Sequence, residues 1–171
     1  MQTANKIHIA MGLLAMAIGT LPLLAALGIL PTRPPAPGDA PNWIGGAIGL
    51  AFFLAGVVVL VRSFAGADDS SGDLPAAAPR PLRAVYDLLA MPIPVLLAVL
   101  FTWVAFGPGE RHFSVSAGDG GSAIAMPLSG GGDIVGRVAF GFGAILGWVF
   151  VGWMIVSMAR RWFPRRGPAP E

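Results

Sequence analysis

Residues 43–61, WIGGAIGLAFFLAGVVVLV, decide the fold, and Arg62 follows them directly. The run carries no charged side chain, and about 20 apolar residues in an α-helix reach across the hydrocarbon core of a bilayer. Trp43 begins the run and Arg62 ends it, a pattern typical of anchoring residues at the two surfaces of a membrane. This stretch is therefore predicted to be a transmembrane helix.

Three more apolar runs of similar length flank it, and the four predicted spans are residues 7–30, 43–62, 84–106 and 137–159. Overall, 55% of the residues are apolar and 12% are charged, against roughly 45–50% and 25% in soluble domains. A water-soluble core cannot use that much apolar surface. The sequence predicts an all-α integral membrane protein, with residues 1–171 forming one domain and four transmembrane helices packed as a bundle.

The connecting segments differ in composition. Residues 31–42 are rich in proline and predict a short, stiff loop, whereas residues 63–83 and the tail 160–171 are polar and predict flexible segments. The first run is longer than the apolar region of a secretory signal peptide, about 7–15 residues, and is interpreted as an uncleaved anchor. Prolines inside two runs predict bends at Pro22 and at Pro92 and Pro94, because proline lacks the backbone N–H.

Basic residues predict the orientation. Eight of them fall on one side of the predicted membrane: Lys6, Arg62, Arg80, Arg83, Arg160, Arg161, Arg165 and Arg166. Three fall on the other side: Arg33, Arg111 and Arg137. The richer side is predicted to be cytoplasmic, with both termini inside. One lysine against ten arginines, with abundant alanine, glycine and proline, is typical of a GC-rich bacterial genome, so the predicted location is a bacterial inner membrane.

Residues 107–136 form the longest connection, which the predicted orientation places outside. Residues 113–116 alternate between apolar and polar side chains, residues 122–126 do so in part, and the Asp119-Gly120 step between them is a turn signal. A small β-hairpin and an unstructured loop both fit this pattern.

Five of the ionisable residues that lie in this loop or directly after it form a candidate polar cluster: Glu110, Arg111, His112, Asp133 and Arg137. One interpretation is a site for a partner or ligand, since loops on a rigid scaffold often carry function. The other is a solvated loop with internal ion pairs. Asp119 lies nearby, but the second histidine expected of a typical metal site is missing, so no metal or other cofactor is predicted.

Small residues recur at four-residue spacing in two of the predicted spans. Gly45 and Gly49 form one row, and Ala139, Gly143 and Gly147 form the other. Such rows let helix backbones approach closely. They indicate either packing within the bundle or a seam for self-association or for a partner.

The absence of several residue types narrows the range of functions that the sequence allows. The chain has no cysteine and only two histidines, and no ionisable side chain falls deep inside a predicted span. The expectation is therefore a non-enzymatic accessory, scaffold or assembly subunit, with the lipid bilayer and either a membrane-protein partner or further copies of itself as partners. Because the arginines cluster at span ends, no nucleic-acid partner is predicted. The alternative is an oligomeric transporter or channel subunit for a small neutral or lipid-like substrate.

Overall fold

The computed structural model describes residues 2–31, 40–67, 74–75, 77–108, 114–117, 124–127 and 132–162. It contains the helices α1 (Gln2–Ala26), α2 (Asn42–Phe64), α3 (Arg80–Ala90), α4 (Pro92–Phe106) and α5 (Gly132–Trp162). Four stretches are long and apolar enough to cross a membrane: Asn5–Ala26, Asn42–Phe64, Arg80–Phe106 and Ile134–Arg160. The prediction of four such helices is confirmed, and α3 and α4 together make up the third.

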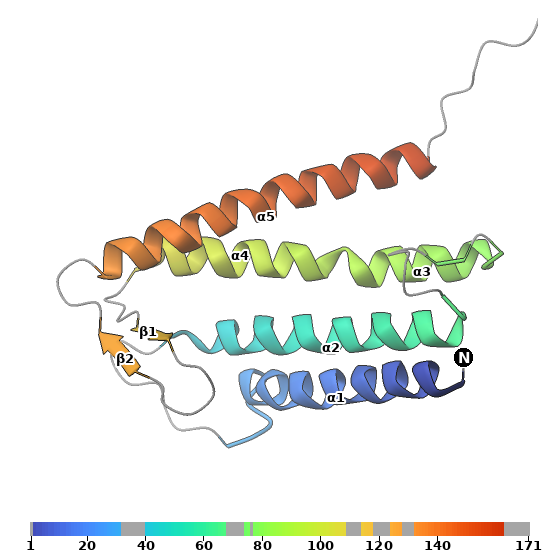
Figure 1. The fold of residues 1–171 in the computed structure, drawn as a ribbon, viewed down its shortest axis with the longest axis horizontal. Coiled ribbons are helices and arrows are strands. Elements are labelled where there is room, and N and C mark those ends of the chain that lie inside the picture. Colours follow the sequence, from blue (N-terminus) through green and yellow to red (C-terminus); the bar gives the residue numbers. More distant parts are fainter. Residues whose placement is uncertain are drawn as a thin grey trace, which may run out of the picture.

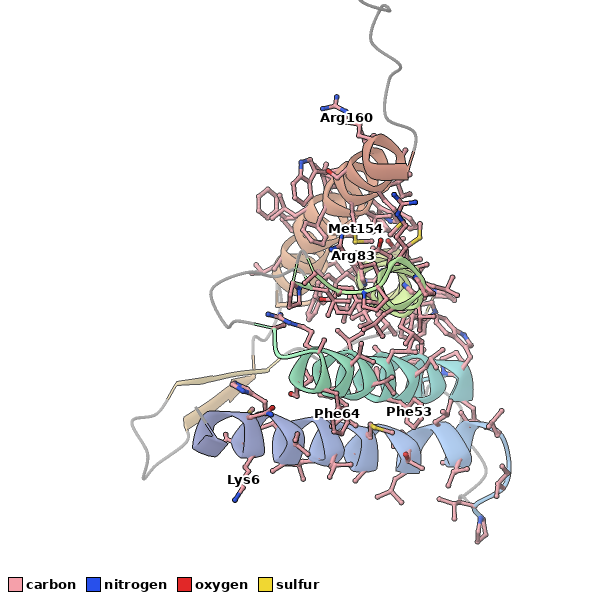
Figure 2. The ribbon with its side chains drawn as sticks, turned by 90° about the vertical axis from the view of Figure 1, so that its right-hand side faces the viewer. Lys6, Phe53, Phe64, Arg83, Met154 and Arg160 are labelled. Atoms are coloured by element: carbon pink, nitrogen blue, oxygen red, sulfur yellow. The ribbon has the colours of Figure 1, made fainter. Side chains whose placement is uncertain are left out.

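The helices lie in an open row in the order α1, α2, α4, α5 (Figures 1 and 2). α1 packs along α2, α2 contacts α3 and α4, and α4 packs along α5. α1 and α5 therefore stand at the two ends of the row, so the four helices that the sequence predicts as one bundle are arranged in an open row. A row is physically allowed in a membrane because lipid covers both of its faces, so nothing drives the helices to enclose a common interior.

Large apolar side chains lie mainly on the outside of this row. Seven apolar residues are buried among those described, and four of these are alanines: Ala51, Ala98, Ala105 and Ala144. Leucine, isoleucine, valine, phenylalanine and tryptophan side chains are exposed along α1 and α5. Exposed apolar surface of this extent is what a helix presents to hydrocarbon rather than to water.

The third span is interrupted where the sequence predicts irregularity. α3 ends at Ala90 and α4 begins at Pro92, while Met91 between them keeps helical backbone angles. Pro92 and Pro94 have no N–H to donate to the preceding turn, so the ladder of hydrogen bonds is broken there. By contrast, α1 continues through Pro22 to Ala26.

Two short strands lie beside the helix ends that are far from the N-terminus (Figure 1). β1 (Ser114–Ala117) pairs antiparallel with β2 (Ile124–Pro127), and Val115 stands opposite Met126. These strands overlap the two segments that alternate in sequence. The turn expected at Asp119-Gly120 lies outside the described residues.

Candidate functional site

The polar cluster expected around the outer loop is described only in part. Glu110, Arg111 and His112 lie outside the described residues, and Asp133 is placed only by the backbone of the first turn of α5. Arg137 follows one turn further along α5 and is half-buried. The cluster therefore stays a prediction, with the start of α5 as its described part.

The closest helix contact lies between α1 and α2, along a glycine seam formed by Gly12, Gly19, Gly49 and Gly56. A Cβ built on Gly19 would lie 2.5 Å from the carbonyl oxygen of Gly49, and one on Gly56 would lie 2.5 Å from that of Gly12. Real Cβ atoms essentially never come this close to backbone atoms. The seam therefore depends on the absence of a side chain, and the two backbones touch directly.

Antiparallel geometry explains how these glycines meet. Gly12 and Gly19 are seven residues apart on α1, and Gly49 and Gly56 are seven apart on α2. Seven residues make about two turns of an α-helix, so residues at this spacing share one face. Because the helices run in opposite directions, Gly12 meets Gly56 and Gly19 meets Gly49.

The two glycines of the predicted α2 row have different environments. A Cβ on Gly49 would lie 2.6 Å from the carbonyl oxygen of Gly19, whereas a Cβ on Gly45 would meet no atom within 4 Å. Gly46, which follows Gly45, is the residue near α1 at this level, since its Cβ would lie 2.8 Å from the Cβ of Ala26. Only Gly49 of the predicted pair lies in the glycine seam.

The predicted α5 row faces α4 at two of its three positions. A Cβ on Gly147 would lie 3.1 Å from the Cβ of Ala98, and a Cβ on Gly143 would lie 3.3 Å from the ring of Phe101. Ala139 is exposed. Gly143 and Gly147 therefore lie at the contact between α4 and α5 within one chain.

A polar contact joins the same two helices. The indole N–H of Trp148 donates to Thr102 Oγ1 at 3.1 Å, and the Thr102 hydroxyl donates to the carbonyl oxygen of Ala98 at 2.7 Å. Hydrogen bonds between transmembrane helices contribute about 0.6 kcal/mol on average. This bond is therefore expected to add little to the stability of the contact between α4 and α5.

Four-residue spacing alone misses half of the glycine seam. Gly12 and Gly56 each lack a small residue four positions away, whereas Gly19 has Ala15 four residues before it. Their signal is a seven-residue repeat, with Ala26 and Ser63 continuing the rows on α1 and α2. A search for small residues at both spacings would have found the whole seam.

The described residues contain no group of three or more histidine, cysteine, aspartate or glutamate side chains that could hold a metal ion. What they do show is four long apolar helices with close small-residue contacts and outward-facing apolar side chains. These features define the class of a multi-pass membrane protein. No protein-family model matches this sequence, and no match was found among curated proteins or solved structures.

Proposed function

We propose that the chain is a non-enzymatic accessory, scaffold or assembly subunit that works through lateral contacts between transmembrane helices. The observation that carries this proposal is the position of α5 at the edge of the open row (Figure 1). This 31-residue helix packs along α4 on one side. Among the described residues no other helix packs along α5, so its other side can contact another membrane protein.

The outward face of α5 suits such a contact. It presents large apolar side chains, including Phe142, Val149, Trp153 and Val156, each between 49% and 64% exposed. Gly152 lies in the same region, and a Cβ there would meet no atom within 4 Å. Aromatic residues and a glycine together offer both anchors and a place where another helix could approach closely. The polar cluster at the start of α5 would extend this surface beyond the membrane.

The proposed location is a bacterial inner membrane, with both termini in the cytoplasm. The support is the basic-residue asymmetry, since Lys6, Arg62, Arg80, Arg83 and Arg160 belong to one side and Arg137 to the other. The arginine-rich, lysine-poor composition supports a bacterial source.

The test is affinity purification in a mild detergent followed by mass spectrometry, with two glycine variants of α5. Gly152→Ile adds a branched side chain where the chain itself has room, whereas Gly147→Ile puts one against Ala98. The first is expected to release a stoichiometric partner and leave the stability of the chain unchanged. The second is expected to lower stability. Retention of every partner by Gly152→Ile, or isolation of the chain without any partner, would count against the proposal.

The interrupted third span favours the second candidate, an oligomeric transporter or channel subunit. The break at Met91, with Pro92 and Pro94 after it, leaves carbonyl groups without a helical donor inside an apolar helix. Broken helices line substrate sites in many transporters. Purification of a homo-oligomer without other proteins would favour this candidate over a scaffold.

A further inference from the structure

Each of the four spans carries a basic residue near the same end of the helices, the end at which α1 begins. These residues are Lys6 in α1, Arg62 in α2, Arg83 in α3 and Arg160 in α5, and they are called the basic row below. The start of α1, the end of α2, α3 and the end of α5 lie together at this end (Figure 1). The contacts between neighbouring helices show how closely these four residues agree in depth along the helix axes.

The glycine seam fixes the depth of Lys6 relative to Arg62 along the helix axes. Gly12 of α1 meets Gly56 of α2. Lys6 is six residues before Gly12, and Arg62 is six residues after Gly56. Because the helices are antiparallel and each residue advances the helix by about 1.5 Å, Lys6 and Arg62 lie at the same depth.

A pair of aromatic rings fixes the depth of Arg83 in α3 relative to Arg62 in α2. The rings of Trp43 and Trp103 pack edge to face with centroids 5.9 Å apart, which aligns α2 with α4. Arg62 is nineteen residues after Trp43, and the residue nineteen before Trp103 is Ala84, next to Arg83. Arg83 therefore reaches the level of Arg62.

The contact between Ala98 and Gly147 aligns α4 with α5. Arg160 is thirteen residues after Gly147, and the residue thirteen before Ala98 is Val85, two positions from Arg83. Two residues correspond to about 3 Å along a helix. The basic row thus occupies one narrow level across all four spans.

This level lies one membrane thickness from the tryptophan pair. The nineteen residues from Trp43 to Arg62 span about 28 Å of helix, close to the roughly 30 Å of a hydrocarbon core. When Trp43 and Trp103 sit at one interface, the basic row sits among the headgroups of the other leaflet.

Among the described residues near this level, basic side chains outnumber acidic ones, and Asp68, Asp69 and Asp73 of the segment 63–83 lie outside the described residues. Arg80 lies one turn beyond Arg83, and Asp87 is the one acidic side chain among the described residues near this level. Lys6 and Arg160 are exposed at opposite ends of the row, and Arg83 lies between them (Figure 2). Arg83 Nη2 donates to the carbonyl oxygen of Pro75 at 3.0 Å, which holds the guanidinium at this level. An arginine has five N–H donors, so such a contact is compatible with binding a phosphate as well.

We propose that the basic row binds the phosphate groups of anionic lipids in the leaflet that it faces. Lipid is favoured over an acidic protein segment because the four cations share the depth of the headgroups rather than projecting into water. The chemistry recognised is a phosphodiester that carries a net negative charge, as in phosphatidylglycerol. Zwitterionic phosphatidylcholine shares the phosphate but presents no net charge.

The test uses the full chain in a neutral detergent, where membrane topology no longer influences the result. Dioleoylphosphatidylglycerol and dioleoylphosphatidylcholine are titrated separately, and bound lipid is counted by native mass spectrometry. The variants are Lys6→Gln and Arg160→Gln, whose side chains are exposed. Arg137→Gln, near the opposite end of α5, is the matched control. Arg161, Arg165 and Arg166 are retained in every variant.

Wild type is expected to bind phosphatidylglycerol at least tenfold more tightly than phosphatidylcholine. Each variant of the basic row should lower phosphatidylglycerol affinity about fivefold, leave phosphatidylcholine binding unchanged, and reduce the effect of added salt. Equal affinity for the two lipids would overturn the proposal, as would an equal loss in Arg137→Gln. Salt-sensitive capture of a protein partner without any lipid preference would also overturn it, in favour of an acidic protein segment.

Discussion

A single added methyl group at Gly49 should separate α1 from α2, whereas the same change at Gly45 should not. A Cβ at Gly49 would lie 2.6 Å from the carbonyl oxygen of Gly19, and ordinary contact begins at 3.4 Å. The helices must therefore move apart by the difference, about 0.8 Å. A Cβ at Gly45 has open space around it.

The expected cost follows from this displacement. A gap of 0.5–1 Å forfeits roughly a quarter to a half of the dispersion energy of the atoms that face each other, and overpacking of this kind costs about 1–3 kcal/mol. We expect Gly49→Ala to lower the free energy of unfolding by about 2 kcal/mol, a change of about thirtyfold in the equilibrium constant. Gly45→Ala should leave stability unchanged or raise it by up to about 1 kcal/mol, because alanine favours helix more than glycine does.

Unfolding in mixed micelles of dodecyl maltoside and sodium dodecyl sulfate measures this difference, with helical circular dichroism as the signal. The double variant Gly19→Ala/Gly49→Ala adds a second check. Once one methyl group has separated the helices, the second meets less resistance, so the two losses should sum to more than the loss in the double variant. Equal stability of Gly45→Ala and Gly49→Ala, or strict additivity of the pair, would refute the proposed direct backbone contact.

Three further outcomes are expected. Gly147→Ile should destabilise the chain more than Gly143→Ile in the same micelles, because the first meets the Cβ of Ala98 and the second meets a ring that can turn; the reverse order would contradict the α4–α5 contact. Trp148→Phe should cost about 0.6 kcal/mol through loss of one interhelical hydrogen bond, and a loss above about 2 kcal/mol would mean that packing dominates there. Reporter fusions at Gly72 and at the C-terminus should report cytoplasm and one near Gly120 the exterior, whereas an exterior signal at Gly72 would reverse the proposed orientation.

The existence of the four spans was predictable from sequence because bilayer thickness sets a length that few soluble helices meet. The stretch 43–61 satisfies it without a single charge. Helix ends were less predictable. α1 begins at Gln2, five residues before the apolar run starts at Ile7, because backbone hydrogen bonds continue into the headgroup region, where hydropathy gives no signal.

The pairing of the helices was not predictable in the same way. Gly45 and Gly49 are equivalent in a four-residue pattern, yet only Gly49 meets α1. Which of them does so depends on the rotation of α2, and the apolar residues surrounding both give no direction, since lipid and a neighbouring helix are equally apolar. The open row escapes prediction for the same reason.

The polar cluster remains a sequence prediction because Glu110, Arg111 and His112 lie outside the described residues. The level of the basic row, by contrast, needed the structure. The sequence assigns its four residues to one side of the membrane: Lys6, Arg62, Arg83 and Arg160. Their common depth follows only from three contacts between helices, which are Gly12 with Gly56, Trp43 with Trp103 and Ala98 with Gly147.

The distance between the two end helices tests the open row most directly. The chain has no cysteine, so spin labels can be placed at Leu14→Cys in α1 and Gly152→Cys in α5 alone; both positions are exposed and lie at nearly the same depth. Three helix spacings of about 8–10 Å separate α1 from α5 in a row, which predicts roughly 24–30 Å between helix axes. Double electron–electron resonance in lipid nanodiscs should give a single distance of that order. A distribution centred below about 15 Å, the diagonal of a closed four-helix bundle at the same spacing, would contradict the row and the free α5 edge on which the proposed function rests.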